Sequence, residues 1–287
     1  MTMLVSWIGV DQRGASSAYI MSESRFSWGL NGKILSRFDY GRKVFASRLY
    51  PEIMGYSGDV LFPTVVLSQI IEMIDMGLLF DEETSCEEKS NCVFNILCDE
   101  LAYYPTNQIG GSTIEILHIS RDTGKICARG EYHYLDFYAY RYIWHRESGW
   151  TKENITIPSH SGVLSVMGSG KKAFEENYVM RYNTEKSNNS NTSRNIYHCF
   201  IDTLNAVTNG TCGGAPQLVG IYRKPGTAAE NFGLVYNNKR YILGVELRDD
   251  VDYNSIEWRN ELFELTDGNT KKILFGAIRQ PDILRRH

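Results

Sequence analysis

The sequence has 287 residues, of which 43% are hydrophobic, and a formal net charge of −4. A chain of this length suits one large α/β domain with a sizeable core, and its acidic balance argues against a nucleic-acid binder that needs a broad basic face. No apolar run reaches the roughly 18 to 20 residues of a membrane-spanning helix, and the first ten residues lack the basic region of a secretory signal. We therefore expect a soluble, cytoplasmic protein without a membrane or nucleic-acid partner.

The first predicted elements are three strands at the start of the chain. Residues 2–10 form an apolar run, and residues 18–21 continue as a second strand that ends at Glu23. An Asn-Gly pair at 31–32, between extended segments, is a strong hairpin signal. Lys43 heads the third strand. The opening of the chain is therefore predicted to be a β meander.

Thr2 is the residue with the most distinctive chemistry in this meander. Aminopeptidases usually remove an initiator methionine that precedes a small residue, and Thr2 would then carry a hydroxyl and a free amine. Such a residue combines a nucleophile with its own general base.

The middle of the chain contains the clearest helix of the sequence. Apolar residues recur at helical spacing between residues 65 and 78, over so much of the circumference that the helix should be buried. The acidic stretch 81–88 is interpreted as a solvated loop. Residues 131–150 are dense in aromatics but poor in basic residues, which favours a packed insertion or a subunit contact over a nucleic-acid platform.

A second buried strand ends in a Gly-Ser-Gly turn at residues 168–170 and leads into a helix. The turn is not a phosphate-binding loop, because Ser165 and Lys172 occupy positions where that loop requires Gly and Ser or Thr. A further helix is expected to end at Asn209-Gly210. Beyond it the tail alternates as strands, and residues 258–265 are predicted to be helical.

Cysteine and histidine show no spacing typical of a metal site. We therefore predict free thiols in a reducing compartment, with no metal and no cofactor. The six cysteines are Cys86, Cys92, Cys98, Cys127, Cys199 and Cys212.

This order of motifs resembles proteasome-type subunits of the N-terminal-nucleophile (Ntn) hydrolase superfamily. Those chains place a Thr at the head of the first strand, an Asp-Ser-Arg-like triplet after the second, a Lys at the head of the third and a later Gly-Ser-Gly turn. The resemblance implies an α+β fold, a four-layer αββα sandwich. It also implies a single domain over 1–287, with an aromatic-rich insertion around 131–160 and a C-terminal extension around 225–287.

The resemblance also implies a catalytic set: Thr2, Glu23, Lys43, Ser169 and Asn209. The free amine of Thr2 would act as general base while its hydroxyl attacks an amide carbonyl. Lys43, held as a cation by Glu23, would lower the pKa of that amine. Ser169 would hydrogen-bond the amine, and backbone N–H groups of the turn 55–58 would form an oxyanion hole. The implied function is a threonine-type amidohydrolase or peptidase that acts on peptides or proteins in a homo- or hetero-oligomer.

The sequence departs from this pattern at two positions, where Glu23 replaces an Asp and Asn209 lacks the carboxylate of its counterpart. An alternative is therefore a catalytically inactive proteasome-like subunit that serves as a binding or assembly module. A third interpretation is an unrelated α+β protein. Ser6 and Cys212 are weaker candidates for the nucleophile, because no signal exposes Ser6 and no acid completes a triad with Cys212.

Overall fold

The structure is a computed structural model that describes residues 2–30, 33–81, 83–122, 135–182, 192–207, 210, 212–248 and 251–279. Within these ranges the chain forms two sheets, a separate hairpin and four α-helices. The helices are α1 (Leu61–Asp75), α2 (Cys86–Tyr103), α3 (Lys171–Asn177) and α4 (Ser193–Ala206).

The larger sheet is built around the first predicted strands. Its strands run in the order β10-β1-β2-β11-β12-β13-β14, and a short β15–β16 pair is attached to β12. The strands are β1 (Leu4–Asp11), β2 (Gly14–Ser22), β10 (Gly162–Met167), β11 (Gln217–Tyr222), β12 (Glu230–Tyr236), β13 (Lys239–Ile242), β14 (Val245–Glu246), β15 (Trp258–Arg259) and β16 (Leu265–Thr266).

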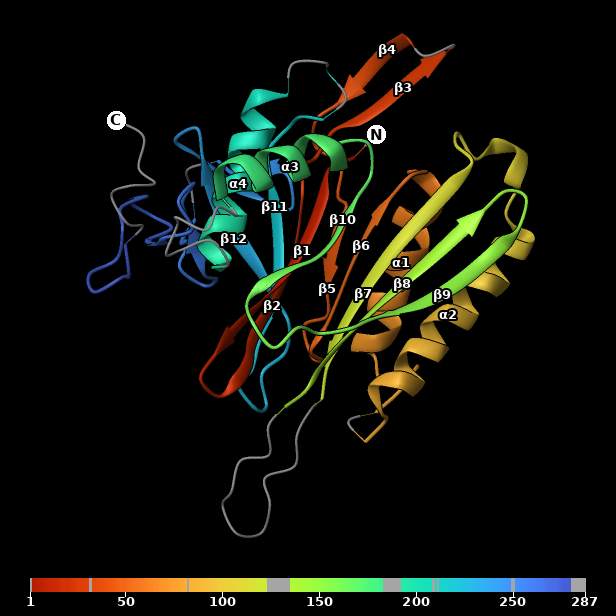
Figure 1. The fold of residues 1–287 in the computed structure, drawn as a ribbon, viewed down its shortest axis with the longest axis horizontal. Coiled ribbons are helices and arrows are strands. Elements are labelled where there is room, and N and C mark those ends of the chain that lie inside the picture. The colour runs from red at the N-terminus through yellow and green to blue at the C-terminus, as the bar shows by residue number, and fades with distance from the viewer. Residues whose placement is uncertain are drawn as a thin grey trace.

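The second sheet has five strands in the order β5-β6-β7-β8-β9, all paired antiparallel. They are β5 (Val44–Ala46), β6 (Glu52–Ser57), β7 (Thr113–Arg121), β8 (Phe137–His145) and β9 (Gly149–Ile155). A separate hairpin, β3 (Phe26–Leu30) with β4 (Lys33–Phe38), projects beside the first residues of the chain (Figure 1). The expected hairpin around the Asn-Gly pair is confirmed by the pairing of the two flanking strands.

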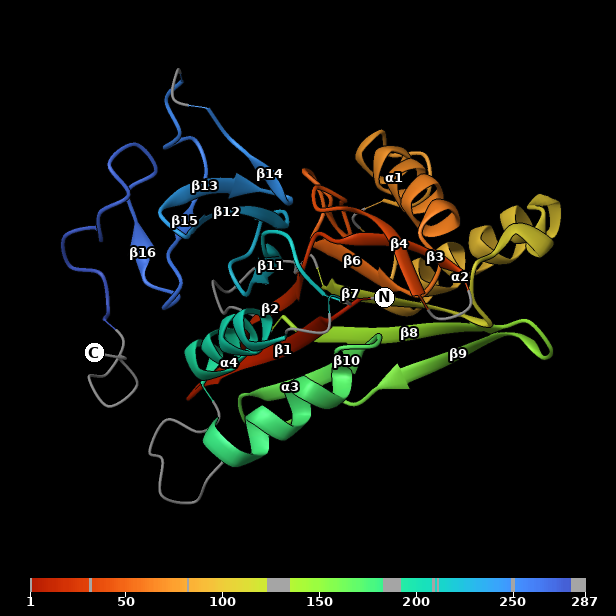
Figure 2. The same cartoon turned by 90° about the horizontal axis from the view of Figure 1, so that it is seen from above.

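Strand β1 is apolar on both faces because both faces are covered. Side chains alternate across a strand, so Val5 and Trp7 pack in the cluster that contains α3 and α4, while Leu4 and Ile8 pack toward the five-stranded sheet. On the far face of the five-stranded sheet, α1 and α2 pack in a third cluster. Figures 1 and 2 show the two helix pairs on opposite sides of the sheets.

The expectation of a four-layer αββα sandwich is wrong as a description of this chain. Strand makes up 37% and helix only 24% of the structure, so the chain is mainly antiparallel β-sheet. The helices cover only part of the sheets: strands β12 to β16 continue beyond the helices (Figure 2), and the β3–β4 hairpin projects from the layers (Figure 1). The aromatic segment is part of the sheet, because residues 137–155 form β8 and β9. The organisation of residues 1–287 as one domain stays a prediction.

The predicted helix at 258–265 is also wrong. Trp258 pairs with Gly233 of β12, and its indole N–H donates to the carbonyl of Tyr253 at 2.7 Å. Phe263 has a φ of 61°, which an α-helix cannot accommodate. Packing of Trp258 against the sheet therefore overrides the helical spacing of the apolar residues.

A buried polar network attaches α2 to the five-stranded sheet. The carboxylate of Glu52 accepts hydrogen bonds from Lys89 Nζ at 3.0 Å and from Ser120 Oγ at 2.7 Å, and it lies 2.8 Å from Nε2 of His118. The other ring nitrogen of His118 lies 2.9 Å from the hydroxyl of Tyr142. All five side chains are at most 1% exposed. A buried charge is tolerated only when it is paired, and this network meets that condition.

Arg121, at the end of β7, connects the two sheets at one end. Its guanidinium donates to the carbonyl oxygens of Lys224 and Thr227, at 2.7 and 2.9 Å, and also to that of Tyr222. These three acceptors lie at the end of β11 and in the loop that follows it. Burial lowers the pKa of Arg121 to about 10, a value at which the side chain is still cationic at neutral pH.

In the described part of the chain, no helix is long and apolar enough to cross a membrane.

Candidate active site

The antiparallel pairing of β10, β1 and β2 brings Thr2, Glu23 and Ser169 to the same end of the sheet. Leu4 pairs with Ser22 of β2 and with Met167 of β10. The beginning of β1 therefore lies between the ends of its two neighbours. Thr2 precedes β1, Glu23 follows β2 and Ser169 follows β10, so three segments far apart in sequence meet at one end of the sheet.

Ser169 contacts Thr2 directly. The backbone nitrogen of Thr2 lies 3.2 Å from Ser169 Oγ, and Gly170 N–H donates to the Thr2 carbonyl at 3.0 Å. Gly168 has a φ of +83°, and a Cβ there would collide with the Thr2 carbonyl. The Gly-Ser-Gly turn thus needs its first glycine for close approach to the start of the chain.

Lys43 and Glu23 form a fully buried ion pair next to Thr2. Lys43 Nζ donates to Glu23 Oε1 and, at 2.7 Å, to the carbonyl of Arg25. The Glu23 carboxylate also accepts the backbone N–H groups of Met3 at 3.4 Å, Arg25 at 2.6 Å and Gly213 at 3.3 Å. The extra methylene of Glu relative to Asp is therefore accommodated, since the carboxylate still reaches both the lysine and the start of the chain.

Burial lowers the pKa of Lys43, and the charge of Glu23 opposes that effect. The opposing effect comes from the adjacent carboxylate, which favours the charged form of the lysine. The pair contacts the start of the chain through its carboxylate, because the Glu23 oxygen that accepts from Lys43 Nζ also accepts the Met3 N–H.

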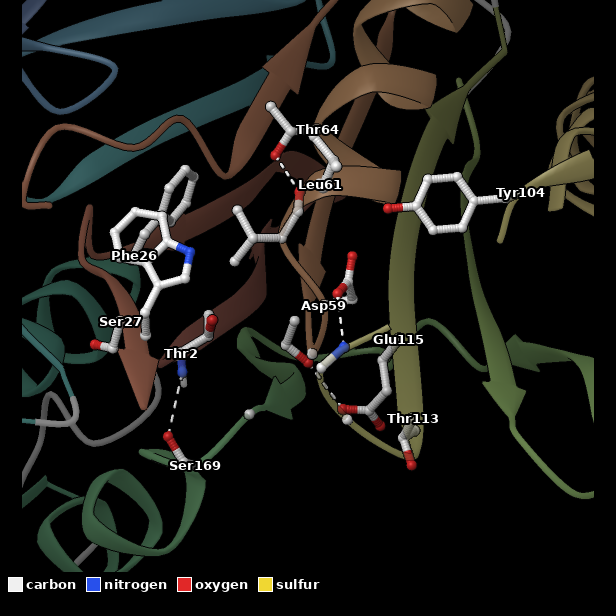
Figure 3. A pocket seen from close by; sticks show the side chains of 17 residues that line it. Thr2, Phe26, Ser27, Asp59, Leu61, Thr64, Tyr104, Thr113, Glu115 and Ser169 are labelled. Carbon is white, nitrogen blue, oxygen red and sulfur yellow. Dashed lines mark hydrogen bonds between the residues drawn. The ribbon is translucent and has the colours of Figure 1, made fainter. Parts of the chain in front are cut away.

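A cleft of about 910 Å³ opens at Thr2 (Figure 3). Thr2 and Ser169 lie on one side of it, and Asp59 and Glu115 lie on the other. Residues 57 and 58, part of the turn expected to supply oxyanion donors, also line the cleft. Gly58 has a φ of +104°, and a Cβ there would collide with the Thr113 carbonyl. A larger residue would therefore push this turn away from the neighbouring strand.

The structure brings together four of the five residues in the expected set. Asn209, the fifth, lies outside the described residues. Of the two fallback nucleophiles, Ser6 is fully buried within β1 and donates to the Ser165 carbonyl at 3.4 Å. Cys212 is also buried, and neither residue lines the cleft.

Gln217 is a supporting residue that sequence reasoning missed. Its side-chain oxygen accepts the Lys43 N–H at 3.0 Å, and its amide group donates to the carbonyls of Gly41 and Glu23 at 2.6 and 3.3 Å. It therefore fixes the backbone on both sides of the ion pair. No motif marks this glutamine, because its role depends on three segments that meet only in the folded chain.

The loop before Gln217 is held by an arginine whose partner is a carboxylate. Arg25 forms a bidentate interaction with Asp39, at 2.6 and 2.8 Å, and donates to the carbonyls of Gly210 and Cys212. Asp39 follows β4, so this pair closes the base of the β3–β4 hairpin next to the site. The guanidinium holds the pKa of the Asp39 carboxyl below its usual range.

Comparison with known proteins gives a likeness of fold and no family. No protein-family model and no curated protein sequence matches the chain. Among solved structures, the chain is similar to Anbu (ancestral beta-subunit) from Yersinia bercovieri, with a TM-score of 0.50 and 11% sequence identity. The match covers 85% of this chain and 88% of that one.

The expected membership of the proteasome-type subunits is therefore wrong as a family assignment. A handful of motif residues spread over 287 positions is too little to constitute sequence similarity, and 11% identity shows a common fold alone. What stands is that this chain shares its fold with an ancestral beta-subunit.

Proposed function

We propose that this protein is a threonine-type amidohydrolase that uses Thr2 as its nucleophile after removal of Met1. The observation that carries the proposal is the contact between the Thr2 backbone nitrogen and Ser169 Oγ at 3.2 Å, at the edge of a cleft and beside a buried Lys43–Glu23 pair. The fold likeness to an ancestral beta-subunit is compatible with this activity but does not establish it.

The chemistry would proceed by acyl transfer. The Thr2 hydroxyl attacks the substrate's carbonyl carbon while its proton passes to the free α-amine, whose ordinary pKa of about 7.7 to 8.0 suits a base near neutrality. The backbone N–H groups at residues 57 and 58 would stabilise the oxyanion. The protonated amine then gives its proton to the leaving nitrogen, which leaves an ester on Thr2. Attack by water on this ester releases the acid and restores the free hydroxyl.

The remaining site residues would act through the amine. Ser169 would hold it in place by the contact already present. Lys43 would lower its pKa by like charge, so that a larger fraction is unprotonated at neutral pH. Glu23 would keep Lys43 charged, and Asn209 stays a predicted member of the set.

Intact-mass spectrometry and turnover of a fluorogenic peptide-amide panel test this proposal together. We expect the purified protein to lack Met1, Thr2→Ser to retain activity and Thr2→Ala to lose it. Equal activity in Thr2→Ala, or turnover by protein that fully retains Met1, would refute the proposal.

A binding or assembly module without turnover is the second candidate. The β3–β4 hairpin favours it, because Trp28, Leu35 and Phe38 expose 54%, 72% and 46% of their surface. Exposed apolar groups on a projecting hairpin are typical of a contact site. Retention of Met1 with no turnover would support this candidate.

In either case we propose that the chain acts as a subunit of an oligomer in the cytoplasm. The exposed hairpin supports the first part. The thiols of Cys86, Cys92 and Cys98, which form no disulfide, support the second. Light scattering coupled to gel filtration would test the assembly, and a monomer at all concentrations would contradict it.

A further inference from the structure

The cleft at Thr2 carries negative charge. Glu115, on β7, and Asp59, just before α1, both line it and are both partly exposed. Among the lining residues that the structure describes there is no lysine, arginine or histidine. The nearest ion pair, Lys43–Glu23, is fully buried and contributes no net charge to the cleft. A ligand that enters the cleft therefore meets two carboxylates and no cation from the described lining.

Asp59 is held in place by backbone donors. One of its oxygens accepts the Phe62 N–H at 3.1 Å, at the start of α1, and the other accepts the Gly110 N–H at 3.2 Å. The helix N-terminus offsets part of the negative charge of Asp59. We therefore regard Asp59 as the secondary contributor to the potential in the cleft.

The negative charge of Glu115 is offset by fewer contacts than that of Asp59. Its Oε2 accepts a hydrogen bond from the Ser57 hydroxyl at 2.9 Å, and no described residue donates to its Oε1. A hydroxyl is neutral, so this contact brings no opposite charge to the carboxylate. Ser57 also adjoins Gly58, at the turn where the oxyanion of the substrate would lie, so Glu115 is one contact away from that turn.

The cleft also has aromatic walls. Phe26, from β3, lies on one side and Tyr104 on the other (Figure 3), and Trp28 of β3 also lines the cleft. Apolar and aromatic surface that leads to a carboxylate suits a side chain with an aliphatic stem and a charged end. Lysine and arginine side chains have this form, and their cations are also attracted to aromatic faces.

We infer that the cleft selects amide substrates whose acyl residue carries a positive charge, with Glu115 as the group that recognises it and Asp59 as a second charge. As a statement about hydrolysis, this inference rests on the proposed function. As a statement about binding, it does not. A glutamyl residue in the same place would be rejected, because it would bring a third carboxylate into the cleft.

The first test uses three coumarin amides that differ only in the acyl residue: acetyl-lysine, acetyl-norleucine and acetyl-glutamate. We expect kcat/KM for the lysyl compound to exceed that for the norleucyl compound by about tenfold, as for one charge-assisted hydrogen bond. In Glu115→Gln, which preserves shape and an acceptor for Ser57, the ratio should fall to about one. In Glu115→Lys the preference should move to the glutamyl compound.

Glu153→Gln is the matched control. Glu153 lies in the same sheet, is 47% exposed and pairs with Arg141 rather than facing the cleft. This variant undergoes the same chemical change, so it should keep the preference for lysine. A lysyl preference that survives Glu115→Gln, or that is absent from the unmodified protein while turnover occurs, would overturn the inference and leave the proposed function intact.

The second test measures binding without chemistry. Thr2→Ala protein is titrated calorimetrically with acetyl-lysinamide and with acetyl-norleucinamide. Tighter binding of the lysine compound, lost in the Thr2→Ala, Glu115→Gln double variant, supports the inference even if no amide is ever hydrolysed, in which case the proposed function alone fails. Equal binding of the two compounds, or no binding of either, would overturn the inference.

Discussion

Two buried lysine–glutamate pairs occupy this molecule, and their surroundings differ. Lys89–Glu52 lies between α2 and the five-stranded sheet, where His118, Ser120 and neighbouring groups complete a closed network. Lys43–Glu23 lies beyond the end of β2, and its carboxylate accepts the backbone N–H of Met3, at the start of the chain. The same pair of residue types therefore lies in two different settings, because one network closes on itself and the other contacts the start of the chain.

Loss of one partner should destabilise the fold more at the Lys89–Glu52 pair than at an exposed pair. Glu52→Ala would leave Lys89 buried without a carboxylate and would remove the acceptor of His118. We expect a loss of about 3–5 kcal/mol in the free energy of unfolding, measured by urea titration. Glu153→Ala, which breaks the exposed pair with Arg141, should cost no more than about 1 kcal/mol. Equal losses in the two variants would show that the buried network is not stabilising.

Loss of the lysine should reduce turnover more at the Lys43–Glu23 pair than at the Lys89–Glu52 pair. Lys43→Met removes the cation beside Thr2, and we expect kcat to fall by roughly 100- to 1000-fold, the range for loss of one group that stabilises developing charge. Lys89→Met is the control, because it removes the corresponding cation from the closed network. Its kcat per folded molecule should be unchanged. If both variants lost kcat equally, the contrast between the pairs would not hold.

Gly168→Ala tests whether the site at Thr2 depends on the close approach of the Gly-Ser-Gly turn to the start of the chain. An alanine at a φ of +83° is strained, and its Cβ would collide with the Thr2 carbonyl. We expect a loss of about 1–2 kcal/mol in stability, together with reduced turnover because Ser169 would move away from Thr2. Gly149→Ala, also at positive φ but in open space, carries the backbone strain without the collision. Similar turnover in the two variants would contradict the role of this contact.

The smallest effect concerns Asp39, whose pKa is lowered by Arg25. A carboxyl with a folded pKa below its unfolded value of about 3.9 adds stability above that pH, and loses it as the pH falls through the lower folded pKa. The pair is partly exposed, so its contribution should be about 1 kcal/mol or less. Urea titrations of the unmodified protein and of Asp39→Asn should differ at pH 6, and the difference should shrink as the pH falls below about 3.9. A difference that does not shrink on acidification would assign the effect to something other than this charge.

Much of the site was predictable because it depends on strand order. A Thr before the first strand, Glu23 after the second and Ser169 after a later strand meet wherever those strands pair antiparallel as neighbours. The family assignment and the regular four-layer sandwich did not follow from these residues. Local motifs say how a few segments end, whereas the extent of a sheet is decided by the packing of the whole chain.

The start of α2 has a recognisable local sequence signal, whereas the supporting role of Gln217 has none. Ser85 and Glu88 form a capping box at the start of α2, and the sequence Ser-x-x-Glu marks such a start, although the stretch 81–88 was interpreted as a loop. Gln217, in contrast, has no such mark. Its partners come from segments more than 170 residues away, and no local pattern encodes that distance.

The position of Arg121 has a mechanical consequence. It ties β7 to the loop after β11 at the end of the sheets opposite the cleft, since Thr113, at the other end of β7, lines the cleft. The sheets are also joined at the other end, because Lys43, just before β5, binds Glu23 and Gln217 of the larger sheet. We therefore expect the two sheets to keep a fixed separation when a substrate enters the cleft.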